Sequence, residues 1–195
     1  MNEKPRESSN QRPRAQQLSN NLEPRVEKPP ILFVDVDGVI SLFGFAPSVE
    51  NLPGPLHLID GVAHCIPPAV GGRLVRLAED FELVWATGWE GRANDHLPYI
   101  LELPFRNLPT LRFDGRAVFG SAHWKLAALD EYAYGRPAAW IDDNIDDACV
   151  QWAAGRGFPT LLVETEPSTG MLDEHVEQLL AWAADLHRDE DVRER

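Results

Sequence analysis

Short apolar runs alternate with helical patterns along most of the chain. Four runs rich in β-branched and aromatic residues predict buried strands, over 31–34, 81–86, 138–141 and 160–163. Five stretches have the character of helices, over 73–80, 90–102, 124–134, 146–154 and 171–187. Strands that alternate with helices build a parallel sheet with helices on both faces. The pattern therefore predicts an α/β, Rossmann-like fold of three layers.

The stretch from about 41 to 70 interrupts this alternation and predicts a small flap or cap. Its clearest signal is Asp60-Gly61 between apolar flanks, which favours a two-residue β-hairpin turn. That turn would place His57 opposite His64. We interpret the two histidines as exposed strand residues, with contact to a substrate as the alternative. The insert has room for a hairpin, a loop and one helix, but not for a separate domain.

The two ends of the chain differ from the part between them. Residues 1–30 are rich in Arg, Gln, Asn, Ser, Glu and Pro without an apolar period, which predicts a disordered tail. The folded domain is expected over 31–188, and residues 189–195 form a charged C-terminal tail.

The formal net charge of −13 resides in the folded part, because the N-terminal tail carries slightly more basic than acidic residues. An acidic body disfavours a long polyanion as partner. A phosphorylated small molecule is therefore the expected partner, and nucleic acid could bind only at a local basic pocket. The sequence gives no indication of the oligomeric state.

The setting is expected to be reducing and cytoplasmic. Two cysteines, Cys65 and Cys149, form neither a disulfide framework nor a CxxC metal pattern. No apolar run approaches the length of a membrane span, and the N-terminus lacks the apolar core of a signal peptide. No contact with a membrane is expected.

The first predicted strand ends in two carboxylates, in the stretch PILFVDVDGVI. Alternation along an extended chain puts Asp35 and Asp37 on the same side. Two like charges repel each other unless a cation or a shared proton offsets them. A calcium loop would need oxygen ligands where Val39 and Ala46 stand, so that interpretation fails. A metal-assisted carboxylate site and a simple turn after the strand remain.

Two other predicted strands also end in polar residues, namely Thr87 and the pair Asp142-Asp143. In a parallel sheet these ends lie at one edge, where ligands bind. Lys125 stands out because it is the only lysine after residue 28. It is either a surface lysine or a compact charge that neutralises carboxylates and binds a phosphoryl oxygen.

Four stretches in this order, FVDVDGV, VWATG, Lys125 and WIDDN, resemble the motifs of the haloacid dehalogenase-like (HAD) superfamily. The match covers roughly residues 31–165. The IDDN stretch and the helix after it resemble phosphatases of polynucleotide kinase–phosphatase type. The WATGWEGRAN and HWKL stretches resemble a bacterial group with a small cap. The resemblance implies a Mg²⁺-dependent phosphomonoester hydrolase that acts through an aspartyl-phosphate.

The resemblance also implies roles for the two carboxylates of the first motif. Asp35 would attack phosphorus, and Asp37 would protonate the leaving oxygen and later deprotonate water. Dehalogenases of the superfamily lack the second Asp, so Asp37 indicates phosphoryl transfer. Mg²⁺ would bind Asp35, the backbone carbonyl of Asp37 and Asp143, with Asp142 near the metal or Lys125.

The remaining motifs are expected to hold the phosphoryl group. Thr87 and the backbone N–H of Gly88 would bind its oxygens, and Lys125 would add positive charge. Asp146 and Asp147 are interpreted as helix-capping residues instead, because they stand at the predicted start of a helix.

Two alternatives remain open. One is a phosphatase that acts on nucleic-acid ends, which the fourth motif favours and the acidic charge disfavours. The other is a catalytically idle interaction module with the same fold.

Overall fold

The computed structural model describes residues 28–45, 52–113 and 122–193, and its centre is a parallel sheet of four strands. The strand order is β4-β1-β5-β6. The strands are β1 (Ile31–Val34), β4 (Glu82–Trp85), β5 (Ala138–Asp142) and β6 (Thr160–Glu164). The α/β class and the parallel sheet are confirmed.

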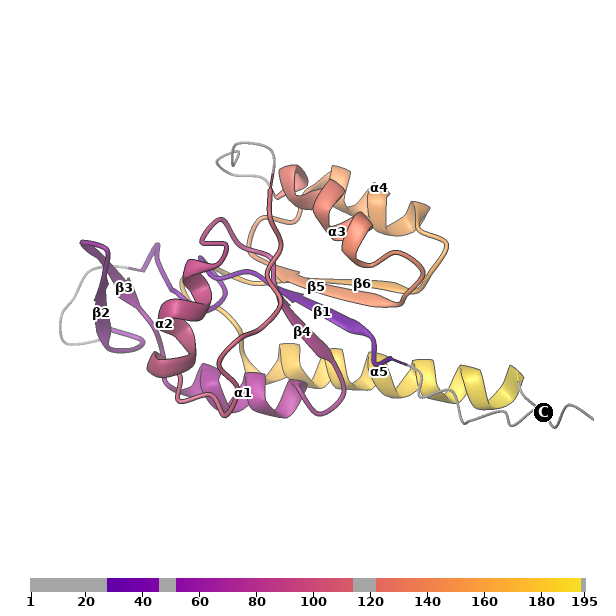
Figure 1. The fold of residues 1–195 in the computed structure, drawn as a ribbon, viewed down its shortest axis with the longest axis horizontal. Helices are drawn as coiled ribbons and strands as arrows, with labels where there is room; N and C mark the ends of the chain where they lie inside the picture. The colour runs from indigo at the N-terminus through magenta and orange to yellow at the C-terminus, as the bar shows by residue number, and fades with distance from the viewer. Residues whose placement is uncertain (1–27, 46–51, 114–121, 194–195) are drawn as a thin grey trace, which may run out of the picture.

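Helices cover both faces of the sheet (Figure 1). They are α1 (Ala69–Leu77), α2 (Arg92–Ile100), α3 (Leu126–Tyr132), α4 (Asp147–Gly155) and α5 (Asp173–Arg193), with a short 3-10 helix, η2 (His123–Lys125). Figure 1 shows α1 and α5 on one face and α3 and α4 on the other, which confirms the three layers. Within the described ranges, no helix is both long and apolar enough to cross a membrane.

Strand β1 lies at the centre of the core, between two apolar clusters. All four of its residues are fully buried. Phe33 belongs to the apolar cluster that holds Leu129 of α3, whereas Val34 belongs to the cluster that holds Leu74 of α1 and Leu179 of α5. A strand covered on both faces must be apolar throughout, which explains its uninterrupted apolar run.

The predicted helices are all present, and two of them, α1 and α5, differ most from their predicted bounds. Helix α1 begins at Ala69, before the predicted start at 73, although its first turns contain Gly71. A Cβ on Gly71 would lie 2.2 Å from the carbonyl oxygen of Leu101, so close packing requires glycine there and overrides its low helix propensity. Helix α5 runs on to Arg193, so most of the segment expected as a charged C-terminal tail is helical.

The predicted hairpin is present as β2 (Leu56–Ile59) and β3 (Val62–Cys65), and His57 pairs with His64 as expected. Asp60 and Gly61 have φ values of 49° and 83°. Both are positive, as a type I′ turn requires. Figure 1 shows the hairpin apart from the sheet, on the side toward which β1 runs. The predicted N-terminal tail lies outside the described residues up to residue 27, as does 46–51 of the predicted flap.

Candidate active site

The carboxyl ends of three strands meet at one edge of the sheet. Val34, the last residue of β1, pairs with Trp85 of β4 on one side and with Ile141 of β5 on the other. The residues that follow each strand therefore lie next to one another. The convergence expected from the sequence is confirmed for Asp35, Asp142 and Asp143, which lie together at this edge.

Lys125 lies between two carboxylates. Its Nζ is 2.9 Å from Oδ2 of Asp35 and 2.6 Å from Oδ2 of Asp142. Its exposed fraction is only 4%, so it is not a surface lysine. Two backbone bonds hold it in place, from Lys125 N to Ala122 O (2.9 Å) and from Ala122 N to Asn144 O (3.1 Å). These bonds fix the 3-10 helix η2 against the loop that follows β5.

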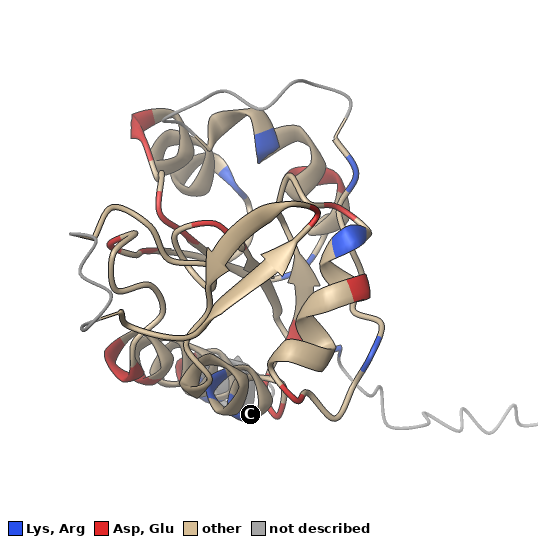
Figure 2. Cartoon of the chain, turned by 90° about the vertical axis from the view of Figure 1, so that its left-hand side faces the viewer, with Lys and Arg blue, Asp and Glu red and all other residues tan. Residues whose placement is uncertain are grey.

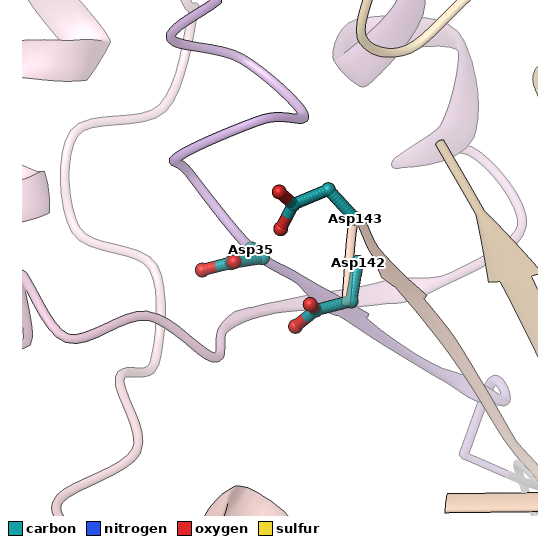
Figure 3. Close-up of side chains that lie close together, drawn as sticks. All are labelled: Asp35, Asp142 and Asp143. Atoms are coloured by element: carbon teal, nitrogen blue, oxygen red, sulfur yellow. The ribbon is translucent and has the colours of Figure 1, made fainter. Parts of the chain in front are cut away.

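Asp35, Asp142 and Asp143 form a cluster that could hold a cation. One carboxylate oxygen from each lies within 4.8 Å of the others. Figure 3 shows the three side chains projecting to the same side of the ends of β1 and β5. One ammonium cannot neutralise three carboxylates, and hard divalent cations prefer oxygen ligands. The donor set therefore fits Mg²⁺.

Asp142 and Asp143 differ in how their oxygens are engaged. Both oxygens of Asp142 have partners, because Oδ2 binds Lys125 and Oδ1 accepts from Asn144 N at 3.0 Å. Asp143 accepts from the Asn144 side chain through Oδ1 at 2.7 Å. Its Oδ2 lies beside the Gly38 backbone. Among the described residues, Asp143 thus keeps one carboxylate oxygen without a hydrogen bond, whereas both oxygens of Asp142 are engaged and one of them binds Lys125.

Gly38 allows the loop after β1 to approach Asp143. Its φ is +76°, and a Cβ there would lie 2.4 Å from the Asp143 carboxyl group. The Thr165 hydroxyl donates to the Gly38 carbonyl at 3.0 Å and fixes this arrangement. Glycine is needed both for the backbone conformation and for the space.

The charges at the cluster perturb each other. Burial raises the pKa of Asp35 to about 7, while attraction by Lys125 opposes the rise. Burial also raises the pKa of Asp143, to about 6. Burial alone would lower the pKa of Lys125, but attraction by Asp35 and Asp142 outweighs it and raises that pKa. The lysine is therefore a permanent charge, and a bound cation would favour the ionised form of both carboxyl groups.

Asp37 lies outside this cluster. Its side chain is exposed, and its Oδ2 accepts a hydrogen bond from the indole Nε1 of Trp89 at 2.9 Å. Asp35 is buried, with an exposed fraction of 6%. The two carboxylates of the first motif therefore have different surroundings, one dry and paired with an ammonium, the other open to water.

Thr87 and Gly88 form the turn after β4. Thr87 is fully buried, and its hydroxyl oxygen accepts from Trp89 N at 3.2 Å. Gly88 is exposed, and a Cβ there would meet only the edge of Trp124, at 3.9 Å. Space above the Gly88 backbone is thus open to a ligand. The roles assigned to Thr87 and Gly88 stay predictions.

Asp146 caps helix α4, as interpreted from the sequence. Its Oδ1 accepts from Cys149 N at 3.0 Å, and Asp147 is an exposed residue of the first turn. Neither belongs to the carboxylate cluster.

Sequence reasoning missed the contacts of Trp89 and His64. Both histidines of the hairpin are half-buried, which corrects the expectation that they are exposed. His64 Nδ1 lies 2.9 Å from the Ser41 hydroxyl, and its ring contacts the Trp89 ring edge-on at 4.6 Å between centroids. The only sequence signal was the position of Trp89 in the WATGW stretch, which does not reveal its partners.

Among the comparisons with known proteins, only the one with solved structures bears on the fold. No family model and no curated protein sequence matches the chain. A solved structure of the HAD domain of the effector protein Lem4 from Legionella pneumophila, an inactive mutant, aligns with a TM-score of 0.50 and 14% identity. It covers 83% of this chain and 99% of that domain. The fold is HAD-like. Another structure of the same domain aligns with a TM-score of 0.49 and 16% identity, and the alignment covers 78% of this chain and 94% of that domain.

Proposed function

We propose that this chain is a Mg²⁺-dependent phosphomonoester hydrolase that acts through an aspartyl-phosphate. The observation that supports it most is the position of Lys125 between Asp35 and Asp142, with Asp143 beside them. A fold gains nothing from gathering three carboxylates and a buried ammonium at a strand edge, because the desolvation of these charges is costly. A reaction that transfers a charged group can use them.

The reaction divides between the two carboxylates of the first motif. Asp35 attacks phosphorus, and the bond from phosphorus to the leaving oxygen breaks while Asp37 gives that oxygen a proton. Asp37, now ionised, then takes a proton from water, whose oxygen attacks the phosphorus of the aspartyl-phosphate. Inorganic phosphate leaves, and both carboxyl groups return to their first state. A buried nucleophile beside a lysine and an exposed acid–base group suit these two roles.

Asp35, Asp143 and the backbone carbonyl of Asp37 would hold the cation. Mg²⁺ in such a site neutralises the charge on phosphoryl oxygens. The engagement of both Asp142 oxygens favours Asp143 over Asp142 as the direct ligand.

Phosphoryl oxygens are bound by Lys125, the Thr87 hydroxyl and the Gly88 N–H. The Lys125 ammonium is buried, so water does not screen its charge, and the Gly88 turn is exposed to solvent. Groups placed in advance around the developing charge stabilise the transition state without reorganising.

The substrate is a phosphorylated small molecule. Figure 2, which looks from the side of the hairpin, shows acidic and basic residues interspersed over both helical layers, without a continuous basic stripe. This pattern suits a compact anion held locally better than a long polyanion. We place the reaction in the cytoplasm.

The test is phosphate release from a panel of sugar phosphates, nucleotides and phosphorylated oligonucleotides, with Mg²⁺ and with EDTA. We expect Mg²⁺-dependent release from small phosphate esters, and a preference for oligonucleotides would favour the nucleic-acid-end phosphatase. Absence of release from every ester would refute the proposal and support the idle module.

A further inference from the structure

We propose that Trp89 is the positioning residue of Asp37, and that the hairpin β2–β3 acts on the reaction through it. The inference rests on the proposed function, because Asp37 needs an orientation only if it transfers a proton. It adds a residue that none of the four motifs of the superfamily resemblance contains.

The contact itself is specific. Trp89 Nε1 donates to Asp37 Oδ2 at 2.9 Å. Within the described part of the chain, the Asp37 carboxylate has no other hydrogen bond. An exposed carboxylate without such a bond turns freely about its side-chain torsions. The bond fixes one oxygen, so the other is held in a constant direction for the leaving group.

The chemistry of the donor suits an acid–base group. An indole N–H donates only and carries no charge. It therefore holds the carboxyl group in place without competing for the proton.

Trp89 is held from the hairpin side. Its ring packs edge-on against His64, with 4.6 Å between centroids and 67° between planes. His64 is in turn bound to Ser41, which is 4% exposed, at 2.9 Å. A salt bridge between Asp60 in the hairpin turn and Arg92 of α2 ties the tip of the hairpin to the protein.

These contacts form a closed chain. It runs from the loop after β1 through Ser41 to His64, then to Trp89, and back to Asp37 in the same loop. A shift of the hairpin would move Trp89, and with it the carboxyl group. The hairpin thereby contributes to catalysis without touching the reacting atoms.

The test is the dependence of kcat/KM on the leaving group, in the full chain with Mg²⁺. Breaking the bond to an alkyl oxygen needs the proton from Asp37, whereas 4-nitrophenolate leaves without one. Trp89→Phe keeps a ring against His64 and removes the N–H. Since general acid catalysis contributes on the order of 10²–10⁴-fold, we expect kcat/KM to fall about tenfold or more for glycerol phosphate. The value for 4-nitrophenyl phosphate should fall less than about threefold.

A matched control is available on the helical layer of α4. Trp152→Phe removes another indole-to-aspartate hydrogen bond, from Nε1 to Asp130 at 3.2 Å. This variant should leave kcat/KM unchanged for both substrates. In an Asp37→Asn background, Trp89→Phe should add no further loss, because the group that it positions is already lost. His64→Ala should show the same selectivity more weakly, and it serves if Trp89→Phe fails to fold.

An equal loss on both esters, or no loss on either, would overturn the role of Trp89. A further loss in the Asp37→Asn background would overturn it as well. If the wild-type protein hydrolyses neither ester, the proposed function is refuted, and the inference with it.

Discussion

Replacement of Lys125 by methionine should destabilise the protein in a pH-dependent way. The substitution keeps the volume of the side chain and removes the charge that faces Asp35 at 2.9 Å and Asp142 at 2.6 Å. The ammonium is 4% exposed and Asp142 1%, so water cannot replace it. Breaking a buried ion pair by removing one partner costs about 3–5 kcal/mol.

The pH dependence follows from the pKa of Asp35, which burial raises to about 7 from an ordinary value of 3.8. The folded protein then holds a proton that the unfolded chain releases, so the free energy of unfolding falls as pH rises from about 4 to about 7. Without Lys125 the pKa rises further. The variant should therefore lose less stability at pH 5, where the carboxyl group of Asp35 is largely neutral, than at pH 8.

The assay is thermal unfolding at pH 5 and pH 8 without divalent cations. At about 2–4 °C per kcal/mol for a chain of this size, the melting temperature at pH 8 should drop by roughly 6–20 °C. Lys28→Met is the control, because Lys28 is exposed. A variant that melts like the wild type at pH 8 would show that Lys125 does not neutralise the two carboxylates.

Three further predictions concern the cation. Asp143→Ala should raise the Mg²⁺ concentration needed for activity far more than Asp147→Ala, because only Asp143 belongs to the cluster; equal shifts in a Mg²⁺ titration would contradict this. Gly38→Ala and Gly61→Ala should each cost about 1–2 kcal/mol in chemical unfolding for their positive φ, and Gly38→Ala should cost more because its Cβ would overlap the Asp143 carboxyl group. Only Gly38→Ala should weaken Mg²⁺ binding by calorimetry, since a Cβ at Gly61 meets nothing; equal Mg²⁺ affinities of the two variants would contradict this. Mg²⁺ should raise the melting temperature more at pH 8 than at pH 5, because protons compete for Asp35 and Asp143; an equal rise would argue against these ligands.

The fold was largely predictable because its signals are local. An apolar run that is buried on both faces, as in β1, needs no knowledge of its neighbours. The Asp60-Gly61 turn is equally local, since both residues adopt the positive φ that a type I′ turn demands. The start of α1 was not predictable, because Gly71 is explained only by the nearby carbonyl of Leu101.

The site was predictable as far as strand order determines it. Asp35, Asp142 and Asp143 stand at the ends of β1 and β5, which are neighbours in the sheet, so their convergence follows from the topology. The burial of Lys125 and the bond from Trp89 to Asp37 depend on the paths of loops, which carry no periodic signal. Such contacts join residues far apart in the chain and emerge only from the tertiary structure.

In the proposed reaction, Asp35 carries the phosphoryl group between substrate and water. The most direct measurement is mass spectrometry of protein quenched in acid during turnover of 4-nitrophenyl phosphate with Mg²⁺. We expect one phosphoryl group on the peptide that contains Asp35, and neither adduct nor turnover in an Asp35→Asn variant that melts like the wild type. A phosphoryl group on another residue, or undiminished turnover by Asp35→Asn, would contradict it.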